Sequence, residues 1–320
     1  MIIMKFAIQL KNNNYFIGAL KLVVSMGLLI FIFRQIDFPA FIAIVRQAHI
    51  RWILTAMSLM ILGVMLRAWR WQILLHAIEV RVSLKELIAI YFVGFLFNNL
   101  LPSGVGGDAI RIVELNKHSK HGADAVTSVL VDRFLGLSAL QAIGTVTLLF
   151  NWNAVPAPIA YLTVTMFVAI MVGGYLLVNR TLYLSLRKNI DLFRRLTDIG
   201  PLGKLFDSFQ SYPTSALQRS YMVSLLFNLS LITMNLSIGL SVGVEATLIQ
   251  YAIFIPITSA VLIIPISFGG LGLREGAYVE LFKSVGVPTE TALAMSLLVY
   301  TIGNLFTGLI GGVVYLLRIM

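Results

Sequence analysis

The chain has 320 residues, of which 58% are hydrophobic and 12% are charged, and it contains no cysteine. Soluble domains are about 25% charged, so this composition, with a mean hydropathy of +0.90, indicates an integral membrane protein. The lack of cysteine excludes disulfides, thiolate catalysis and cysteine metal sites. A net charge of +10 would suggest nucleic-acid binding in a soluble protein. Because basic residues of membrane proteins gather in cytoplasmic loops, we expect no nucleic-acid partner here.

Apolar runs of the roughly 20 residues needed to cross a bilayer recur along the chain, and none alternates like a barrel strand. The sequence therefore predicts an all-α polytopic membrane protein with about six full spans. The predicted spans are 15–33, 52–69, 123–150, 159–178, 221–242 and 292–317. We interpret the first as a retained span rather than a signal peptide, because it lacks a small-residue cleavage site.

The second predicted span ends in a cluster of basic and aromatic residues. The cluster consists of Arg67, Trp69, Arg70 and Trp71. Tryptophan and arginine together are typical of the membrane–water interface. We therefore expect this cluster to anchor the end of the span at the membrane surface.

Two shorter apolar segments each stop at a proline that is followed by a glycine pair. The first reads LPSGVGGDAIR from Leu101, and the second reads IPISFGGLGLREG from Ile264, so both share the frame PxxxGGxxxR. Both are too short for a comfortable crossing, and Pro256 interrupts the second, so we expect re-entrant hairpins near 87–111 and 248–287. The predicted turn residues are Pro102, Gly106 and Gly107 in the first hairpin, and Pro265, Gly269, Gly270 and Gly272 in the second.

The charge distribution divides the chain into two halves, 1–178 and 221–320, joined by a linker at 179–220. The linker mixes basic and apolar residues, which is typical of amphipathic helices on the cytoplasmic surface. Alternating the spans around it places both termini in the cytoplasm and gives the halves opposite orientations. This topology leaves Arg34, Arg46 and Arg51 outside, against the usual charge bias. Inverted repeats with broken helices are characteristic of transporters that bind substrate near the midplane.

Charged residues next to the glycine turns form the candidate binding site. Arg111 and Arg274 lie in the first turn of the helices that follow, where free N–H groups and a guanidinium suit an anionic headgroup. The alternative for Arg111 is that it only anchors a cytoplasmic loop. We expect Glu275 to neutralise Arg274 when the site is empty. Asp108 is a further candidate contact, and Asn98, Asn99 and Asn304 are weaker ones, because amides also serve plain helix packing.

Asp132 and Arg133 are adjacent charges on the long helix predicted at 123–150. They lie about 14 Å along it, at a depth where charges are costly and are functional candidates. We expect Asp132 to pair with Arg111 and Arg133 to face a cavity. A purely structural salt bridge is the alternative. His118 and His121 lack metal-ligand spacing and no nucleotide-binding motif is complete, so we expect no metal, cofactor or catalytic residue.

The segments LPSGVGGDAIR and ISFGGLGLREG, with VDR on a long apolar helix between them, resemble the transmembrane flippase-type domain of lysylphosphatidylglycerol synthetases and related stand-alone membrane proteins. The resemblance covers nearly the whole chain. It implies re-entrant segments and movement of a charged lipid between leaflets. Two-part members make that lipid with a cytosolic aminoacyl-transferase domain. Because nothing of that size follows Met320, we do not expect synthetase activity or any other enzymatic activity.

We therefore expect a transporter in the cell (inner) membrane. Its expected substrate is an anionic or aminoacylated phospholipid, or a lipid-linked phosphate such as a prenyl phosphate. Two alternatives stay open: a membrane-embedded transferase acting on a lipid phosphate, and a non-transporting partner of a lipid-modifying enzyme. A second copy of the chain is a further candidate partner.

Overall fold

The computed structural model describes residues 26–27, 37–100, 106–116, 122–199, 201–263, 267 and 269–319, and these ranges contain helices and no strand. The all-helical prediction is confirmed. Five helices, counted over these ranges, are long and apolar enough to cross a membrane. They cover Ile50–Ala77, Ala125–Phe150, Ala157–Leu177, Thr214–Ser241 and Thr289–Leu317. The first predicted span, 15–33, lies outside the described residues except for a helical fragment at residues 26 and 27.

The helices follow one another with short connections. The elements are α3 (Phe38–Arg46), α4 (Ile50–Ala77), α5 (Leu84–Leu100), α6 (Gly106–Leu115), α7 (Gly122–Phe150), the 3-10 turn η1 (Trp152–Ala154), α8 (Ala157–Val178), α9 (Arg180–Asn189), α10 (Asp191–Ile199), α11 (Pro201–Gln210), α12 (Thr214–Ser241), α13 (Leu248–Val261), α14 (Leu273–Lys283), α15 (Thr289–Tyr300), the π-helical turn η2 (Thr301–Phe306) and α16 (Thr307–Ile319).

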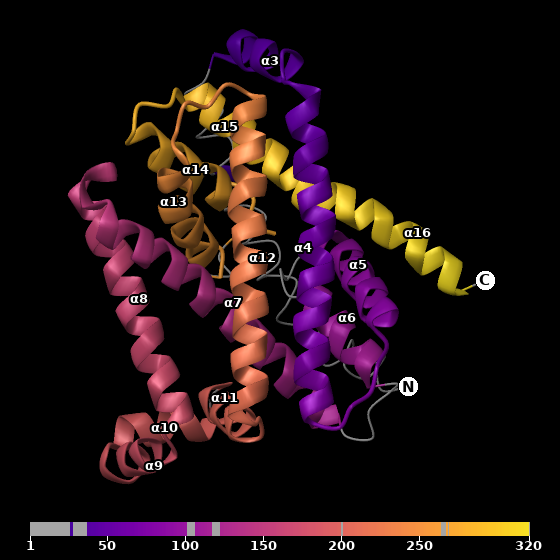
Figure 1. Ribbon diagram of the computed structural model, residues 1–320, viewed down its shortest axis with the longest axis vertical. Helices are drawn as coiled ribbons and strands as arrows, with labels where there is room; N and C mark the ends of the chain where they lie inside the picture. The colour runs from indigo at the N-terminus through magenta and orange to yellow at the C-terminus, as the bar shows by residue number, and fades with distance from the viewer. Residues whose placement is uncertain are drawn as a thin grey trace.

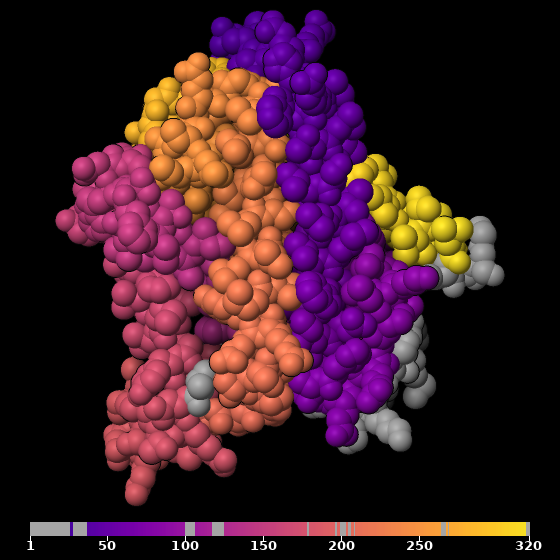
Figure 2. All heavy atoms as spheres, viewed as in Figure 1, coloured from indigo at the N-terminus to yellow at the C-terminus, as the bar shows by residue number. Residues whose placement is uncertain are grey.

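Helices α4 and α12 form the centre of the molecule and run antiparallel (Figures 1 and 2). The His49 N–H, just before α4, donates to the Ser241 carbonyl at the end of α12 (2.9 Å). Farther along, the Ser230 hydroxyl donates to the Leu59 carbonyl (3.1 Å). Small and polar residues at this contact let the two backbones approach closely, as is usual between membrane helices.

The two halves pack with a two-fold pattern around this central pair. Helix α5 of the first half packs on α16, the last helix of the second half, and α13 of the second half packs on α7 of the first. Each half thus contains a long helix, a pair of short helices and another long helix. Because α4 and α12 are antiparallel, the two sets run in opposite directions, which is the arrangement expected of an inverted repeat.

Each pair of short helices forms a hairpin. We call α5 with α6 the first hairpin and α13 with α14 the second. Helices α6 and α14 have 10 and 11 residues, about 15 Å each, or half the thickness of a hydrocarbon core. Pro102 and Pro265 lie outside the described residues. Gly269, Gly270 and Gly272 have φ of 57°, 80° and 79°, values that side-chain-bearing residues rarely adopt.

Two boundaries differ from the sequence predictions. Helix α13 runs through Pro256 without a break and ends only after Val261, so the predicted interruption at Pro256 is wrong. Gly144 of α7 lies against the proline ring, where an added Cβ would be 2.8 Å from its Cγ. This packing holds α13 where the proline removes a helical hydrogen bond. The linker also ends early, because α12 begins at Thr214 rather than at 221.

Short amphipathic helices lie at both ends of the central pair (Figure 1). Helix α3 has no buried residue and exposes Phe38, Ile42 and Val45, as expected of a helix lying in a membrane interface. At the other end, α9, α10 and α11 pack together around Tyr183 of α9. The ring of Tyr183 stacks on that of Phe206, with 3.5 Å between the ring centres. The linker thus forms three short helices, and α3 is a further short helix at the opposite end of the central pair.

Candidate functional site

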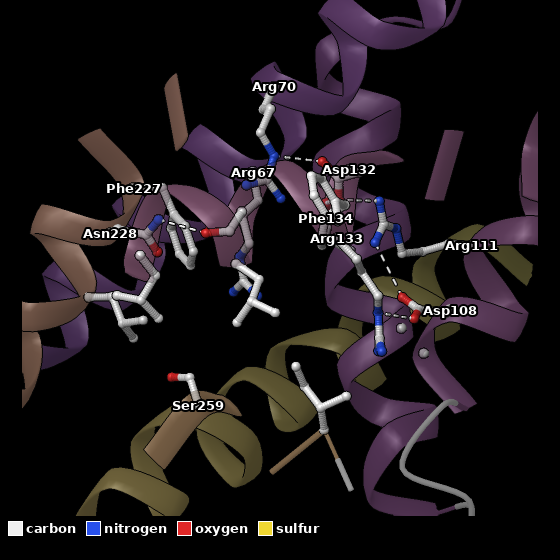
Figure 3. A pocket seen from close by; sticks show the side chains of 18 of the residues that line it. Arg67, Arg70, Asp108, Arg111, Asp132, Arg133, Phe134, Phe227, Asn228 and Ser259 are labelled. Atoms are coloured by element: carbon white, nitrogen blue, oxygen red, sulfur yellow. Dashed lines mark hydrogen bonds and ion pairs between the residues drawn. The ribbon is translucent and has the colours of Figure 1, made fainter. Parts of the chain in front are cut away.

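A cavity of about 460 Å³ lies between α4, α5, α6, α7, α12 and α13 (Figure 3). We call it the arginine cavity. Phe95, Phe134, Phe227 and Leu231 form part of its apolar wall. The charged residues that line it are Arg67, Arg70, Asp108, Arg111, Asp132 and Arg133.

Asp132 is the centre of the buried charge network and is 1% exposed. Its Oδ1 accepts a hydrogen bond from Arg70 Nε (2.6 Å), and its Oδ2 accepts from Arg111 Nη2 (2.9 Å) and from the Tyr91 hydroxyl (2.9 Å). These donors come from α4, α6 and α5, so one carboxylate on α7 joins three other helices. A buried carboxylate is tolerated at this depth only when such partners compensate for its lost hydration.

Arg111 links the first hairpin to this network. Its Nη1 donates to Asp108 Oδ1 (3.2 Å), and its guanidinium lies 4.2 Å from the ring centres of both Trp71 and Tyr91. Asp108 also pairs with Arg133 of α7, whose side chain is half-exposed and lines the cavity. The predicted pairing of Asp132 with Arg111 and the predicted position of Arg133 are both present. Asp108, a predicted substrate contact, is engaged by two arginines.

Arg67 differs from the other three arginines because no carboxylate pairs with it in the part of the chain that the structure describes. Its Nε donates weakly to the Gly63 carbonyl (3.4 Å). Its guanidinium lies 4.9 Å from the ring centres of Phe95 and Phe227 and 5.6 Å from that of Tyr91. Aromatic rings attract a cation without neutralising it, so Arg67 presents a full positive charge to the cavity.

One backbone N–H group at the start of α6 is already hydrogen-bonded to a side chain of α5. The Gly107 N–H donates to Asn98 Oδ1 (2.6 Å), and an added Cβ on Gly107 would lie 2.8 Å from the Gly94 carbonyl oxygen. The predicted role of this N–H as a headgroup contact therefore does not fit, because Asn98 already uses it. Asn98 still lines the cavity beside Asp108. The carboxylate of Asp108, in the first turn of α6, complements the positive end of that helix.

The charged residues Arg274 and Glu275 of the second hairpin do not line the arginine cavity. The Arg274 guanidinium lies 4.9 Å from the ring centre of Tyr300, and Glu275 Oε2 accepts from the Gly272 N–H (2.5 Å). No ion pair joins Arg274 to Glu275 among the described residues, which differs from the predicted neutralisation. Adjacent helical residues point about 100° apart, so Glu275 closes its own helix start. The second hairpin reaches the arginine cavity instead with Ser259 of α13 (Figure 3) and with Ile263, which lies just after that helix.

Asn99 also lies outside the arginine cavity. Its Nδ2 donates to the Asn304 carbonyl (2.7 Å) inside the π-helical turn η2. Asn99 lines a separate, mostly apolar cavity of about 560 Å³ between α5 and α16. The structure therefore separates the neighbouring amides Asn98 and Asn99, which the sequence analysis grouped together.

Arg67, Arg70 and Tyr91 also line the cavity, and the sequence alone did not predict them as site residues. The predicted interface anchor is wrong for Arg70 and Trp71, which are buried in the middle of the protein, and for Arg67, which lines the cavity. Helix α4 continues to Ala77, well beyond the predicted end of the span. The spacing of these residues could have predicted their shared position. Arg67, Arg70 and Trp71 follow the pattern i, i+3, i+4, which places them on one face of a helix.

No group of three or more histidine or acidic side chains that could hold a metal ion occurs in the described ranges. Carboxylates Asp108 and Asp132 are both held by arginines. The cavity is therefore suited to an anion rather than to a cation, because its carboxylates are occupied and its cations are in excess.

The sequence matches a known protein family over most of its length. The model of the lysylphosphatidylglycerol synthase transmembrane region matches residues 18–311. The chain belongs to this family. It is also similar to the UPF0104 membrane protein PH1989 of Pyrococcus horikoshii, with 24% identity over 324 residues that cover 93% of this chain and 96% of the relative. A UPF0104 membrane protein of Methanothermobacter thermautotrophicus is 22% identical over 271 residues, covering 75% of this chain and 76% of the relative.

Membership of the lysylphosphatidylglycerol synthase transmembrane-region family is consistent with a lipid-related function in a membrane. In this member of the family, the matched region includes both hairpins and every charged residue of the arginine cavity. The cavity is thus part of the family's shared transmembrane region and not an addition at one end of the chain.

Proposed function

We propose that this protein moves a lipid with an anionic headgroup between the two leaflets of a membrane. The headgroup occupies the arginine cavity while the acyl or prenyl chains remain in the bilayer. The observation that carries the proposal is the excess of arginines in a cavity enclosed by apolar helices. Charges at membrane depth are costly and are kept where they bind substrate or ions.

The depth of the charges supports this proposal. Arg67 lies ten residues before the end of α4, and Asp132 lies ten residues after the start of α7. At about 1.5 Å per residue, both are about 15 Å from a helix end, close to the middle of a hydrocarbon core of about 30 Å. A headgroup bound there is halfway between the leaflets.

The two-fold packing supplies a route for exposing the cavity alternately to each side. Residues from both halves line it, with α4 to α7 on one side and α12 and α13 on the other. Rocking of one half against the other would open it toward one leaflet and then the opposite leaflet, as in other inverted-repeat transporters. We place the linker helices α9 to α11 in the cytoplasm because of their basic residues.

A membrane-embedded transferase remains the competing proposal, but the cavity offers it little. General-base chemistry needs a group that is free to accept a proton. Both carboxylates of the cavity, Asp108 and Asp132, already accept bonds from arginines. We therefore propose transport without chemical change of the lipid.

The test is transbilayer movement in liposomes that contain the purified protein. Lipids with a fluorescent headgroup are quenched from outside, and the fraction that becomes accessible is followed over time. We expect wild-type protein to accelerate movement and Arg67→Gln, which removes a charge from the cavity without breaking an ion pair of the described residues, to slow it. Arg195→Gln, an exposed linker arginine, serves as the control. Movement no faster than in protein-free liposomes would overturn the proposal, and a new lipid species by mass spectrometry would favour the transferase.

A further inference from the structure

The charges of the arginine cavity do not balance. Four arginines face two aspartates, which leaves a formal net charge of two positive units. Asp132 is shared by Arg70 and Arg111, and Asp108 is shared by Arg111 and Arg133. The excess is therefore not removed by any further carboxylate in the described ranges. In a low-dielectric cavity, such an excess is stabilised when an anion of matching charge binds.

Arg67 is the group most available to that anion. Its Nε makes a single weak bond to the Gly63 carbonyl, and the described residues offer no partner to its two terminal nitrogens. The ring centres of Phe95 and Phe227 lie 4.9 Å from the guanidinium carbon, so aromatic rings rather than carboxylates surround this group. The edge of a guanidinium is the side that binds phosphate oxygens in a bidentate manner.

Headgroups differ in how well they match two positive charges. A phosphate monoester carries about 1.5 to 2 negative charges at neutral pH, because its second pKa is about 6. A phosphodiester carries one negative charge, and an aminoacylated phosphodiester adds a cation that the arginines would repel. The apolar wall, which includes Phe134, Leu137 and Leu140, suits the first part of a lipid chain.

We propose that the lipid bound in the arginine cavity has a dianionic headgroup, a phosphate monoester or a diphosphate, and that Arg67 selects it. This inference rests on the proposed function, since it names the substrate class of the same cavity. A protein with this selectivity would not bind cationic aminoacylated lipids in the cavity. Arg70 and Arg111 add positive charge to the cavity, and each already donates one hydrogen bond to Asp132.

Binding measurements on the purified protein in nanodiscs of neutral lipid test the inference without requiring transport. The probes are phosphatidic acid, phosphatidylglycerol and lysylphosphatidylglycerol with identical acyl chains, together with soluble glycerol phosphate. At pH 8 we expect phosphatidic acid to bind at least about tenfold more tightly than phosphatidylglycerol, as the added charge-assisted hydrogen bond implies. Glycerol phosphate binding as tightly as phosphatidic acid would assign the cavity to a free phosphate compound and overturn the lipid assignment.

The pH dependence gives a second readout. Arginines keep their charge across the accessible range, whereas a phosphate monoester loses its second charge below its pKa of about 6. Phosphatidic acid should therefore bind more weakly at pH 5 than at pH 8, and phosphatidylglycerol should bind equally at both. Equal affinities of the two lipids at pH 8 would overturn the inference.

The variants assign the selectivity to Arg67. Arg67→Gln should abolish the preference for phosphatidic acid over phosphatidylglycerol, and Arg67→Lys should retain part of it. Arg195→Gln makes the same change of charge on the exposed linker and should retain all of it. A preference that survives Arg67→Gln would overturn the role of Arg67. If liposomes show no lipid movement but the preference persists, the transport proposal fails while the charge selection stands.

Discussion

Arg111 and Asp132 join the first hairpin to the long helix α7 through a buried ion pair of 2.9 Å. The corresponding pair in the second half is Arg274 with Tyr300, in which an aromatic ring replaces the carboxylate. The repeat frame aligns Arg111 with Arg274. If the second copy carries a short insertion after this arginine, Ser128 and Val131 match Ser296 and Val299, and Asp132 then matches Tyr300. The two halves therefore share the position of an arginine but differ in its partner, which concentrates charge in the first half.

Removing the charge of Asp132 should destabilise the protein more than any exposed substitution. Asp132→Asn leaves Arg70 buried without its carboxylate partner and leaves Arg111 with Asp108 alone, and breaking a buried pair in this way costs about 3–5 kcal/mol. Thermal unfolding in detergent, followed by tryptophan fluorescence, measures the loss. Asp191→Asn, which breaks the exposed pair with Arg194, should change the unfolding temperature little.

A second substitution refines this prediction. Arg111→Gln combined with Asp132→Asn removes a cation together with the carboxylate, so the double variant should lose less stability than the sum of the two single variants. Additive losses would show that the two residues act independently and would contradict the buried pair as the link between α6 and α7.

A methyl group on Gly107 should separate the two helices of the first hairpin. The added Cβ would lie 2.7 Å from Asn98 Nδ2 and 2.8 Å from the Gly94 carbonyl oxygen, and a backbone atom cannot move aside without shifting α5. Overpacking of this kind costs about 1–3 kcal/mol, and we expect Gly107→Ala to lower the unfolding temperature accordingly. Gly276→Ala, where an added Cβ meets nothing within 4 Å, is the matched control and should be neutral or stabilising.

Tyr300 should contribute to stability through its ring rather than through its hydroxyl. The Arg274 guanidinium lies over this ring, and such contacts contribute about 0.5–2 kcal/mol. Tyr300→Leu should therefore lower the free energy of unfolding by about that amount, while Tyr300→Phe should keep most of it. Denaturant unfolding of the three proteins measures the difference. An equal loss for Phe and Leu would mean that the hydroxyl, and not the ring, supports Arg274.

The topology predicts which surfaces face opposite sides of the membrane. The protein has no native cysteine, so single cysteines report position without background. Ala40→Cys on α3 and Ser185→Cys on α9 replace exposed residues at opposite ends of the central pair (Figure 1). We expect an impermeant thiol reagent applied to intact cells to label Ala40→Cys, and to label Ser185→Cys only after lysis. Labelling of both from the same side would contradict the antiparallel arrangement of the halves across the membrane.

The sequence alone determined the class of protein, most helix positions and the two hairpins. These features depend on local properties: the length of an apolar run, the break imposed by proline and glycine, and the spacing of charges along one helix. The pairing of Arg111 with Asp132 also followed from sequence, because a deeply placed carboxylate needs a cation and the repeat frame supplied one.

The tertiary structure alone decided which other charges share the cavity. Arg67 and Arg70 follow an apolar run and look like an interface anchor, and only the continuation of α4 to Ala77 places them inside a longer helix. Their partners, Asp132, Ser224 and Phe227, lie on helices far away in sequence. Such contacts depend on how helices pack against one another, which the composition of a single segment does not encode. Sequence thus determined that charges interrupt the apolar segments, and packing decided that Arg67 has no carboxylate partner among the described residues.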